Sequence, residues 1–174
     1  MITKKLIAVA IFGILAISCS VVDDLLTFSI DNEASVTIPA GFPVNTPLDF
    51  SAETPSNSST VFENNNTNAD KVKDVRLKEL KMTITNPANK SFSFLKSIHL
   101  YISTNDSNEI ELAYLDNINS TSSTITLTPT SEKLDIYVKA PSFRLRVSAV
   151  TKETVTENIT VKADMRFQVT ADPF

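Results

Sequence analysis

Two side chains offer chemistry that the rest of the sequence lacks: His99 is the only histidine and Cys19 the only cysteine. A zinc site needs several histidine or cysteine ligands, so this composition excludes a zinc enzyme. A histidine base would need a nucleophile to activate, and the chain contains no Gly-x-Ser-x-Gly motif. His99 lies beside Tyr101 in Ile98–Ile102, opposite the apolar side of that segment. We therefore expect a surface histidine, no catalytic residue and no cofactor.

Oxygen ligands are more plentiful than nitrogen or sulfur ligands. The stretch 105–109 reads Asn-Asp-Ser-Asn-Glu, and Asp116-Asn117 adds two more oxygen donors. Neither stretch has the spacing or the glycine of a calcium loop, and such runs are typical of hairpin turns, so we expect no metal site. Glycoside hydrolysis needs a pair of carboxylates, and the sequence gives no reason to prefer any two of the five candidate residues. These are Glu63, Asp74, Glu79, Glu109 and Glu111.

Aromatic residues bear on glycan binding, because sugars stack on exposed rings. Tryptophan is absent, which leaves Tyr101, Tyr114 and Tyr137 for this role. Most phenylalanines fall on the apolar sides of their segments, so we expect them in the core. The partner predicted on these grounds is an unidentified protein or glycan.

The N-terminal segment has the three parts of a secretory signal. Lys4 and Lys5 precede an apolar run from Leu6 to Ile17, and Ser18 is a small residue before Cys19. The apolar run is shorter than the roughly 20 residues needed to span a bilayer. We therefore predict that residues 1–18 are a cleaved signal peptide with a signal helix.

Leu15-Ala16-Ile17-Ser18-Cys19 resembles the lipobox of bacterial lipoproteins. The resemblance implies that the thiol of Cys19 is diacylglycerylated, that cleavage occurs before it, and that the new amine is acylated, with palmitate among the usual chains. Two or three acyl chains hold a protein firmly on a bilayer. The alternative is an ordinary signal peptide with an incidental cysteine.

The tether at residues 19–24 contains the pair Asp23-Asp24. Acidic residues placed there resemble the export signal of Bacteroidetes lipoproteins, which implies an outer-membrane location in the cell envelope and possible surface display. An acidic tether without signal function is the alternative. Cleavage removes Lys4 and Lys5 and leaves 14 basic against 20 acidic residues, a net charge of −6. That charge disfavours nucleic-acid binding.

Residues 25–174 predict one all-β domain. Alternating apolar residues mark eight or nine strands, and the cleanest alternation runs from Ile159 to Val169. No crossover helix separates the strands, which favours an antiparallel β-sandwich with immunoglobulin-like or Greek-key order. The remaining segments are assigned at Phe28–Ile30, Val36–Ile38, Leu80–Ile84, Phe92–Ile102, Ile110–Tyr114, Ile125–Leu127, Leu134–Val138 and Phe143–Val147.

Local irregularities are also expected. Near Lys78-Glu79 the apolar residues change from odd-numbered to even-numbered positions, which predicts a β-bulge or a strand start. Residues 68–75 could instead form one helical turn. Pro39–Pro43 with Pro47 predicts a stiff loop, and Thr54–Asn68 an exposed mobile one. Gly41 is the only glycine after the signal, so asparagine or aspartate should serve turns with positive φ. The positions expected are Asn86, Asn89, Asn105-Asp106 and Asn117.

The stretch 78–87, a strand that runs into Asn86-Pro87, is similar to the central strand of water-stress and late-embryogenesis β-sandwich domains. It covers ten residues and agrees with a β-sandwich.

Together the features of the sequence predict a membrane-anchored lipoprotein with a non-catalytic binding or scaffolding domain. Two alternatives are a carboxylate-based hydrolase at the envelope, which a concave pocket with paired carboxylates would favour, and an accessory subunit of an outer-membrane complex, which an exposed apolar patch would favour.

Overall fold

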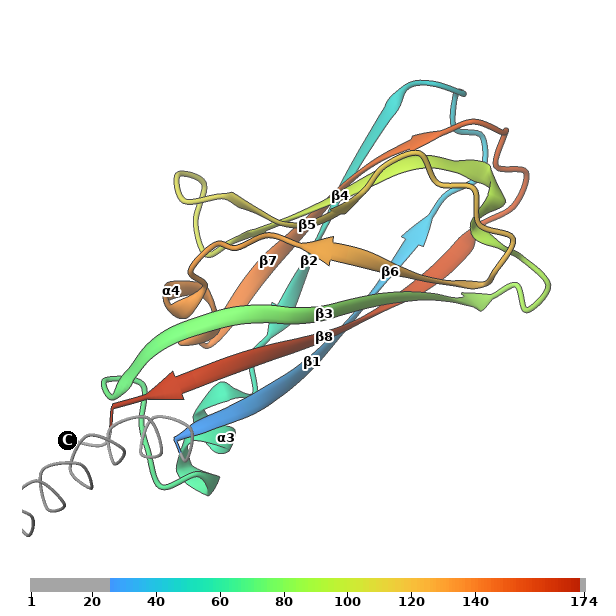
Figure 1. The fold of residues 1–174 in the computed structure, drawn as a ribbon. Coiled ribbons are helices and arrows are strands. Elements are labelled where there is room, and N and C mark those ends of the chain that lie inside the picture. Colours follow the sequence, from blue (N-terminus) through green and yellow to red (C-terminus); the bar gives the residue numbers. More distant parts are fainter. Residues whose placement is uncertain (1–25, 173–174) are drawn as a thin grey trace, which may run out of the picture.

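The computed structural model describes residues 26–172, so the signal segment 1–18, Cys19 and the tether through Asp24 lie outside the described residues. Eight strands form the body of the domain, with short helical segments between them (Figure 1). The strands are β1 (Thr27–Ile38), β2 (Pro47–Pro55), β3 (Val72–Asn86), β4 (Leu95–Ser103), β5 (Ile110–Leu115), β6 (Thr124–Pro129), β7 (Ser142–Thr151) and β8 (Ile159–Ala171). The helical segments are α3 (Ser58–Asn64), η1 (Phe92–Phe94) and α4 (Asp135–Val138). In these residues no helix is long and apolar enough to cross a membrane.

The strand order is β1-β8-β3-β6-β5-β4-β7-β2. Four antiparallel pairs are nested along the chain: β1 with β8, β2 with β7, β3 with β6 and β4 with β5. Nested pairs of this kind form a double-sheet jelly roll built from Greek keys. The expected antiparallel β-sandwich is confirmed, and of the two orders considered the structure has the Greek-key one.

The jelly roll has two layers, which we name sheet A (β1, β8, β3 and β6) and sheet B (β5, β4, β7 and β2). A short pairing of β5 with β6, at Ala113 and Tyr114, connects the two layers along one side. On the other side, β1 and β2 end the strand order and form no ladder with each other.

The core lies between the sheets, where the apolar positions of each strand point inward. In β8 every second residue from Ile159 to Ala171 is buried, as the sequence alternation predicts. Phe143 of β7 and Phe167 of β8 meet edge to face across the layers, with ring centroids 6.4 Å apart and an interplanar angle of 76°. Both rings are fully buried, so this contact connects the two sheets at the centre of the core.

Strand β3 carries the irregularity expected near Lys78-Glu79. Its register with β8 shifts between Leu77 and Glu79, which confirms the parity change as a β-bulge or similar irregularity. The helical alternative for residues 68–75 is wrong, because β3 already begins at Val72.

Two segments predicted as strand are helical instead. Phe92–Phe94 forms the 3₁₀ turn η1, in which the Ser91 hydroxyl accepts a hydrogen bond from the Ser93 amide. Leu134–Val138 contains α4: Leu134, Tyr137 and Val138 are buried, while Ile136 is 56% exposed. The buried residues have the i, i+3, i+4 spacing of a helix, which here overrides the alternation of Leu134, Ile136 and Val138.

The segment between β1 and β3 is more ordered than expected. Thr54–Asn68 contains the end of β2 and the helix α3, rather than one exposed loop. Phe62 of α3 is 2% exposed and packs edge to face on Phe28, with ring centroids 6.2 Å apart. Burial of this one ring fixes a helix whose other residues are mostly polar.

Asparagine residues adopt positive φ angles, as expected, but most of them are not the asparagines predicted from the sequence. Within residues 26–172 the positive φ angles belong to Asn45, Asn66, Asn117 and Gly41. Asn117 is therefore confirmed, whereas the expectation is wrong for Asn86, Asn89, Asn105 and Asp106. The Asn105–Asn108 turn satisfies its amides through side-chain oxygens without a left-handed residue.

Candidate functional site

The outer face of sheet B gathers aromatic and charged side chains into two adjacent rows. His99 of β4 pairs with Tyr114 of β5 on one side and with Ser148 of β7 on the other. Tyr101, two residues on, pairs with Glu111 of β5 and Arg146 of β7. Residues two apart on a strand share a face, so the ladder itself brings these side chains together. We call this group, completed by Asp49, Glu109 and Asp116, the aromatic face.

His99 is held by a carboxylate at each ring nitrogen. Its Nδ1 lies 2.6 Å from Glu111 Oε1, and its Nε2 lies 3.3 Å from Asp116 Oδ1. The hydrogen bond with Glu111 raises the pKa of His99; burial opposes the rise, and Asp116 adds to it. The charged imidazolium donates from both nitrogens, so this geometry favours the cation over a free base.

Tyr114 supplies the exposed ring of the aromatic face. Its side chain stacks against the imidazole of His99, with ring centroids 5.9 Å apart and an interplanar angle of 20°. Tyr114 is 36% exposed, whereas most large apolar residues of the strands are buried. An exposed aromatic ring braced by a fixed neighbour loses little side-chain entropy when a ligand stacks on it.

Arg146 holds the second row in place. It binds Glu109 through Nε at 3.0 Å and NH2 at 2.7 Å, and Asp49 of β2 through NH1 at 2.8 Å. Its guanidinium carbon lies 4.0 Å from the centroid of the Tyr101 ring. The hydrogen bond with Glu109 is the main reason that the pKa of Arg146 is raised above its ordinary value. A two-point ion pair plus a ring contact makes this side chain well ordered.

Arg146 and Asp49 were not singled out from the sequence. The signal for Arg146 was present, because the buried alternation of Phe143, Leu145 and Val147 places the intervening arginines on the outer face. Asp49 could not be found in this way, since β2 was not recognised as a strand.

The five candidate carboxylates do not form one site. Asp74 and Glu79 lie on β3 in sheet A, Glu109 and Glu111 lie on the aromatic face, and Glu63 lies on α3. Glu109 is paired with Arg146, Glu111 with His99 and Asp74 with Arg76. Glu79 also pairs with Lys81 and Arg166. Because these four carboxylates already have basic partners, the arrangement gives no support to a pair poised for acid and base catalysis.

The oxygen-rich turn at 105–109 uses its oxygens internally. Asn108 Oδ1 accepts from the amide of Thr104 at 2.9 Å, and Asn105 Oδ1 accepts from the amide of Ser107 at 2.9 Å. Asp106 pairs with Arg144 and Glu109 with Arg146. In the described part of the chain, no group of three histidine, cysteine, aspartate or glutamate residues could hold a metal ion.

The three tyrosines named for ligand stacking separate into two groups. Tyr137 is 3% exposed and donates its hydroxyl hydrogen bond to the Asn108 carbonyl at 2.6 Å, so it braces the 105–109 turn from inside. Tyr101 and Tyr114 lie on the aromatic face. His99 lies at the surface, as expected, but inside this cluster rather than as an isolated strand residue.

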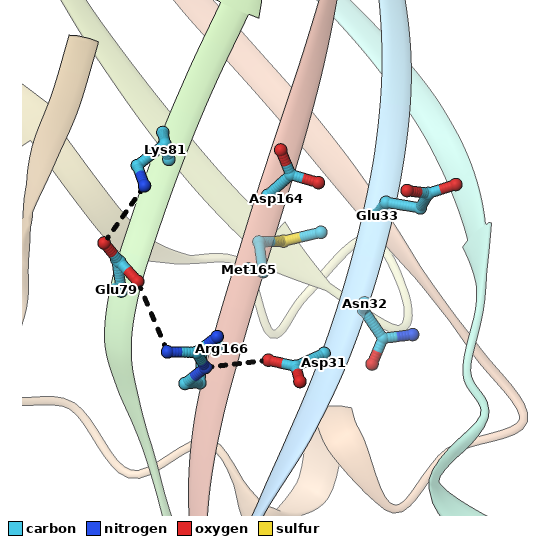
Figure 2. Close-up of a pocket in the computed structure, with 8 residues that line it drawn as sticks. All are labelled: Asp31, Asn32, Glu33, Glu79, Lys81, Asp164, Met165 and Arg166. Carbon is cyan, nitrogen blue, oxygen red and sulfur yellow. Dashed lines mark hydrogen bonds and ion pairs between the residues drawn. The ribbon is translucent and has the colours of Figure 1, made fainter. Parts of the chain in front are cut away.

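The outer face of sheet A contains a second feature, a charged hollow of about 420 Å³ over β1, β8 and β3. Figure 2 shows Arg166 between Asp31 and Glu79, with Lys81 beyond Glu79. The Nε atom of Arg166 lies 2.9 Å from Asp31 Oδ1, while NH1 lies 3.6 Å from Glu79 Oε2. Met165 and Asn32 contribute to the floor, and the lining includes no aromatic ring.

No family model and no curated protein matches the chain. Solved structures with a similar fold include the acidic stable capsid structure of Helicobacter pylori bacteriophage KHP30, at 10% identity, 85% coverage of this chain, 99% coverage of that chain and a TM-score of 0.37. The decameric BFDV capsid protein matches at 10% identity over 82% of this chain and 98% of that chain, with a TM-score of 0.37. The Clostridium perfringens protein CpGH89CBM32-5, in complex with GalNAc-beta-1,3-galactose, matches at 12% identity over 76% and 94% of the two chains, with a TM-score of 0.33.

Proposed function

We propose that the chain is a lipid-anchored envelope protein whose jelly-roll domain binds a neutral glycan on the aromatic face without catalysing a reaction. The proposal combines a sequence expectation, the anchor at Cys19, with a structural observation, the exposed ring of Tyr114 held against His99 and flanked by Glu111 and Asp116. The anchor would place the domain at the outer membrane.

The chemistry of the aromatic face suits a polyhydroxylated ligand. Sugar rings present apolar C–H faces that stack on an aromatic ring, and hydroxyl groups that bind fixed donors and acceptors. Tyr114 offers the ring, Glu111 and Asp116 offer oriented oxygen atoms around the adjacent His99, and Arg146 offers a fixed guanidinium in the neighbouring row with Tyr101. Four carboxylates against Arg146 and His99 leave the face net negative, which disfavours an acidic glycan and suits a neutral one.

The binding test uses the purified full chain in mild detergent on an array of neutral and charged glycans. Tyr114→Ala should abolish binding because it removes the stacking surface, whereas Tyr114→Phe should keep most of it. Ile136→Ala is the matched control, since it truncates another exposed apolar side chain on α4, away from the aromatic face. Binding that survives Tyr114→Ala with the fold intact would contradict the assignment of the face.

The anchor has a separate test in cells that express the chain. Cys19→Ala should abolish acylation and release the protein from the membrane fraction, because acyl chains on Cys19 are the proposed attachment. Metabolic labelling with a palmitate analogue and fractionation after a high-salt wash measure the two effects. Retention of the Cys19→Ala protein in washed membranes would show that the anchor is assigned to the wrong residue.

A further inference from the structure

We propose that the free edge of β1 is a docking site for an extended segment of a partner protein, in which small apolar residues alternate with lysine or arginine. Such a segment would add to sheet A as a further strand and cover the seam between β1 and β2. This surface is separate from the aromatic face and does not depend on glycan binding.

The first observation is the direction of the main-chain groups of β1. In an antiparallel ladder, the N–H and C=O groups of successive residues point alternately toward and away from the paired strand. The carbonyl of Asp31 accepts a hydrogen bond from Asn57 Nδ2 at 2.9 Å, so it points away from β8. By this alternation Glu33, Ser35 and Thr37 have the same direction, and among residues 26–172 no main-chain hydrogen bond outside the strand ladders is found for them.

The second observation is the incomplete cover of the core along the seam. Ala34 and Val36 of β1 and Phe50 and Ala52 of β2 occupy inward positions, yet they are only half-buried. They line an apolar cavity of about 20 Å³, whose deeper wall includes Leu145. A cavity of this size has room for about one methyl group, which one branch of a valine side chain on an added strand would supply.

The third observation is a pair of buried polar atoms at one end of the seam. Asn32 is 9% exposed and Thr54 is 2% exposed, and both lie on inward positions of the two edge strands. Asn32 Nδ2 donates to the Pro55 carbonyl at 3.3 Å, but neither Asn32 Oδ1 nor Thr54 Oγ1 has a hydrogen-bond partner in the described residues. A buried polar atom without a partner costs free energy, so the contact between the two edge strands is incompletely satisfied at this end of the seam.

Charge determines the kind of segment that fits. The outward side chains of β1 include Asp31 and Glu33, which are 68% and 74% exposed. Between Leu26 and Asp70 the chain has six acidic residues and no lysine, arginine or histidine. A second copy of β1 would bring the same acidic residues to the edge, whereas lysine or arginine opposite Glu33 would form a favourable cross-strand pair, with Asp31 adding negative charge nearby.

The edge strands differ in how they are protected against pairing. Strand β2 begins at Pro47 and ends at Pro55, residues that block extension of a ladder at both ends. Strand β1 has twelve residues and no proline. The free segment is therefore on β1, from Glu33 to Thr37, beyond the point where Asn57 covers Asp31.

The test uses the full chain in mild detergent and a synthetic peptide that alternates lysine and valine. Two control peptides replace lysine by glutamate or group the lysines and valines in separate blocks. The alternating basic peptide should bind and slow the amide hydrogen exchange of Glu33, Ser35 and Thr37, while both controls should bind much more weakly. Equal binding of the acidic peptide, no binding of the basic one, or dimerisation through β1 would overturn the proposal.

The variant Ser35→Pro removes one edge-facing N–H without removing a hydrogen bond to β8, and it should abolish peptide binding. Ser35→Ala keeps the N–H and should bind like the wild type. If Ser35→Pro does not fold, Glu33→Lys replaces it and should shift the preference from the basic toward the acidic peptide. Peptide binding that is unchanged in a folded Ser35→Pro protein, or in Glu33→Lys, would show that β1 is not the site.

Discussion

The outer faces of the two sheets come from the same alternation of inward apolar and outward polar residues, yet their surfaces differ in kind. On sheet A the outward residues form an ion-pair network, in which Arg166 is 55% exposed between two acids. On sheet B the corresponding arginine, Arg146, is 30% exposed, is held at two points by Glu109 and covers Tyr101. The aromatic residues of the sheet A strands, Phe28 and Phe167, pack into the core instead.

This contrast separates what the fold requires from what the surface adds. Any set of polar residues that alternates with apolar ones would satisfy the outer face of a sandwich, and the ion pairs around Arg166 do no more than that. Aromatic rings on an outer face cost solubility and are not needed for the ladder. Their presence on sheet B, braced by paired charges, is the reason to assign binding to that face.

The largest expected effect concerns the core that the two faces share. Phe167→Ala should destabilise the domain by about 3 to 5 kcal/mol, because it removes a fully buried ring and its contact with Phe143. Urea melts followed by circular dichroism measure the change. Phe167→Leu is the control and should cost much less, since it leaves a smaller cavity. A loss below about 1 kcal/mol for Phe167→Ala would mean that the two sheets do not depend on this contact.

Much of the fold follows from the sequence, for a physical reason. Strands such as β8 bury every second residue, so the periodicity of the sequence and the burial in the structure agree. Strand β2 was not recognised because its inward residues, Leu48, Phe50, Ala52 and the polar Thr54, lie in a short segment between prolines and do not form a purely apolar alternation. Segment α4 was misread because Leu134 and Val138 satisfy a strand period and a helix period at once.

The candidate site was less predictable than the fold. Sequence alternation places His99 and Tyr101 on one outer face, but it cannot show which strands lie beside them. The neighbours Tyr114 and Arg146 depend on the register of β4 with β5 and with β7, across chain separations that local patterns do not encode. Asp116 lies beyond the end of β5, where no periodicity applies.

An intermediate effect should distinguish the two arginines. Arg146→Met should destabilise the domain by about 1 to 2 kcal/mol, because it removes a two-point ion pair and a cation–π contact from a half-buried side chain. Arg166→Met, the matched change on sheet A, should leave the urea midpoint nearly unchanged, since its partners are exposed and well solvated. Equal effects of the two substitutions would remove the energetic difference between the faces on which the comparison rests.

The smallest expected effect is a pH dependence confined to the aromatic face. Because Glu111 and Asp116 raise the pKa of His99 in the folded state, protonation stabilises the fold. That contribution should be fully present below the unfolded pKa of about 6.5 and should disappear as pH rises through the higher folded pKa. His99→Gln should fold normally, and its stability deficit relative to the wild type should shrink as pH rises through this range.

The pKa itself can be measured directly. As the only histidine, His99 gives unambiguous imidazole signals in an NMR titration of the untagged chain. Glu111→Gln, which removes the main cause of the shift, should return the measured pKa toward its ordinary value. A wild-type pKa at or below 6.5 would show that Glu111 and Asp116 do not hold the imidazolium, and the aromatic face would then lose the charged brace behind Tyr114.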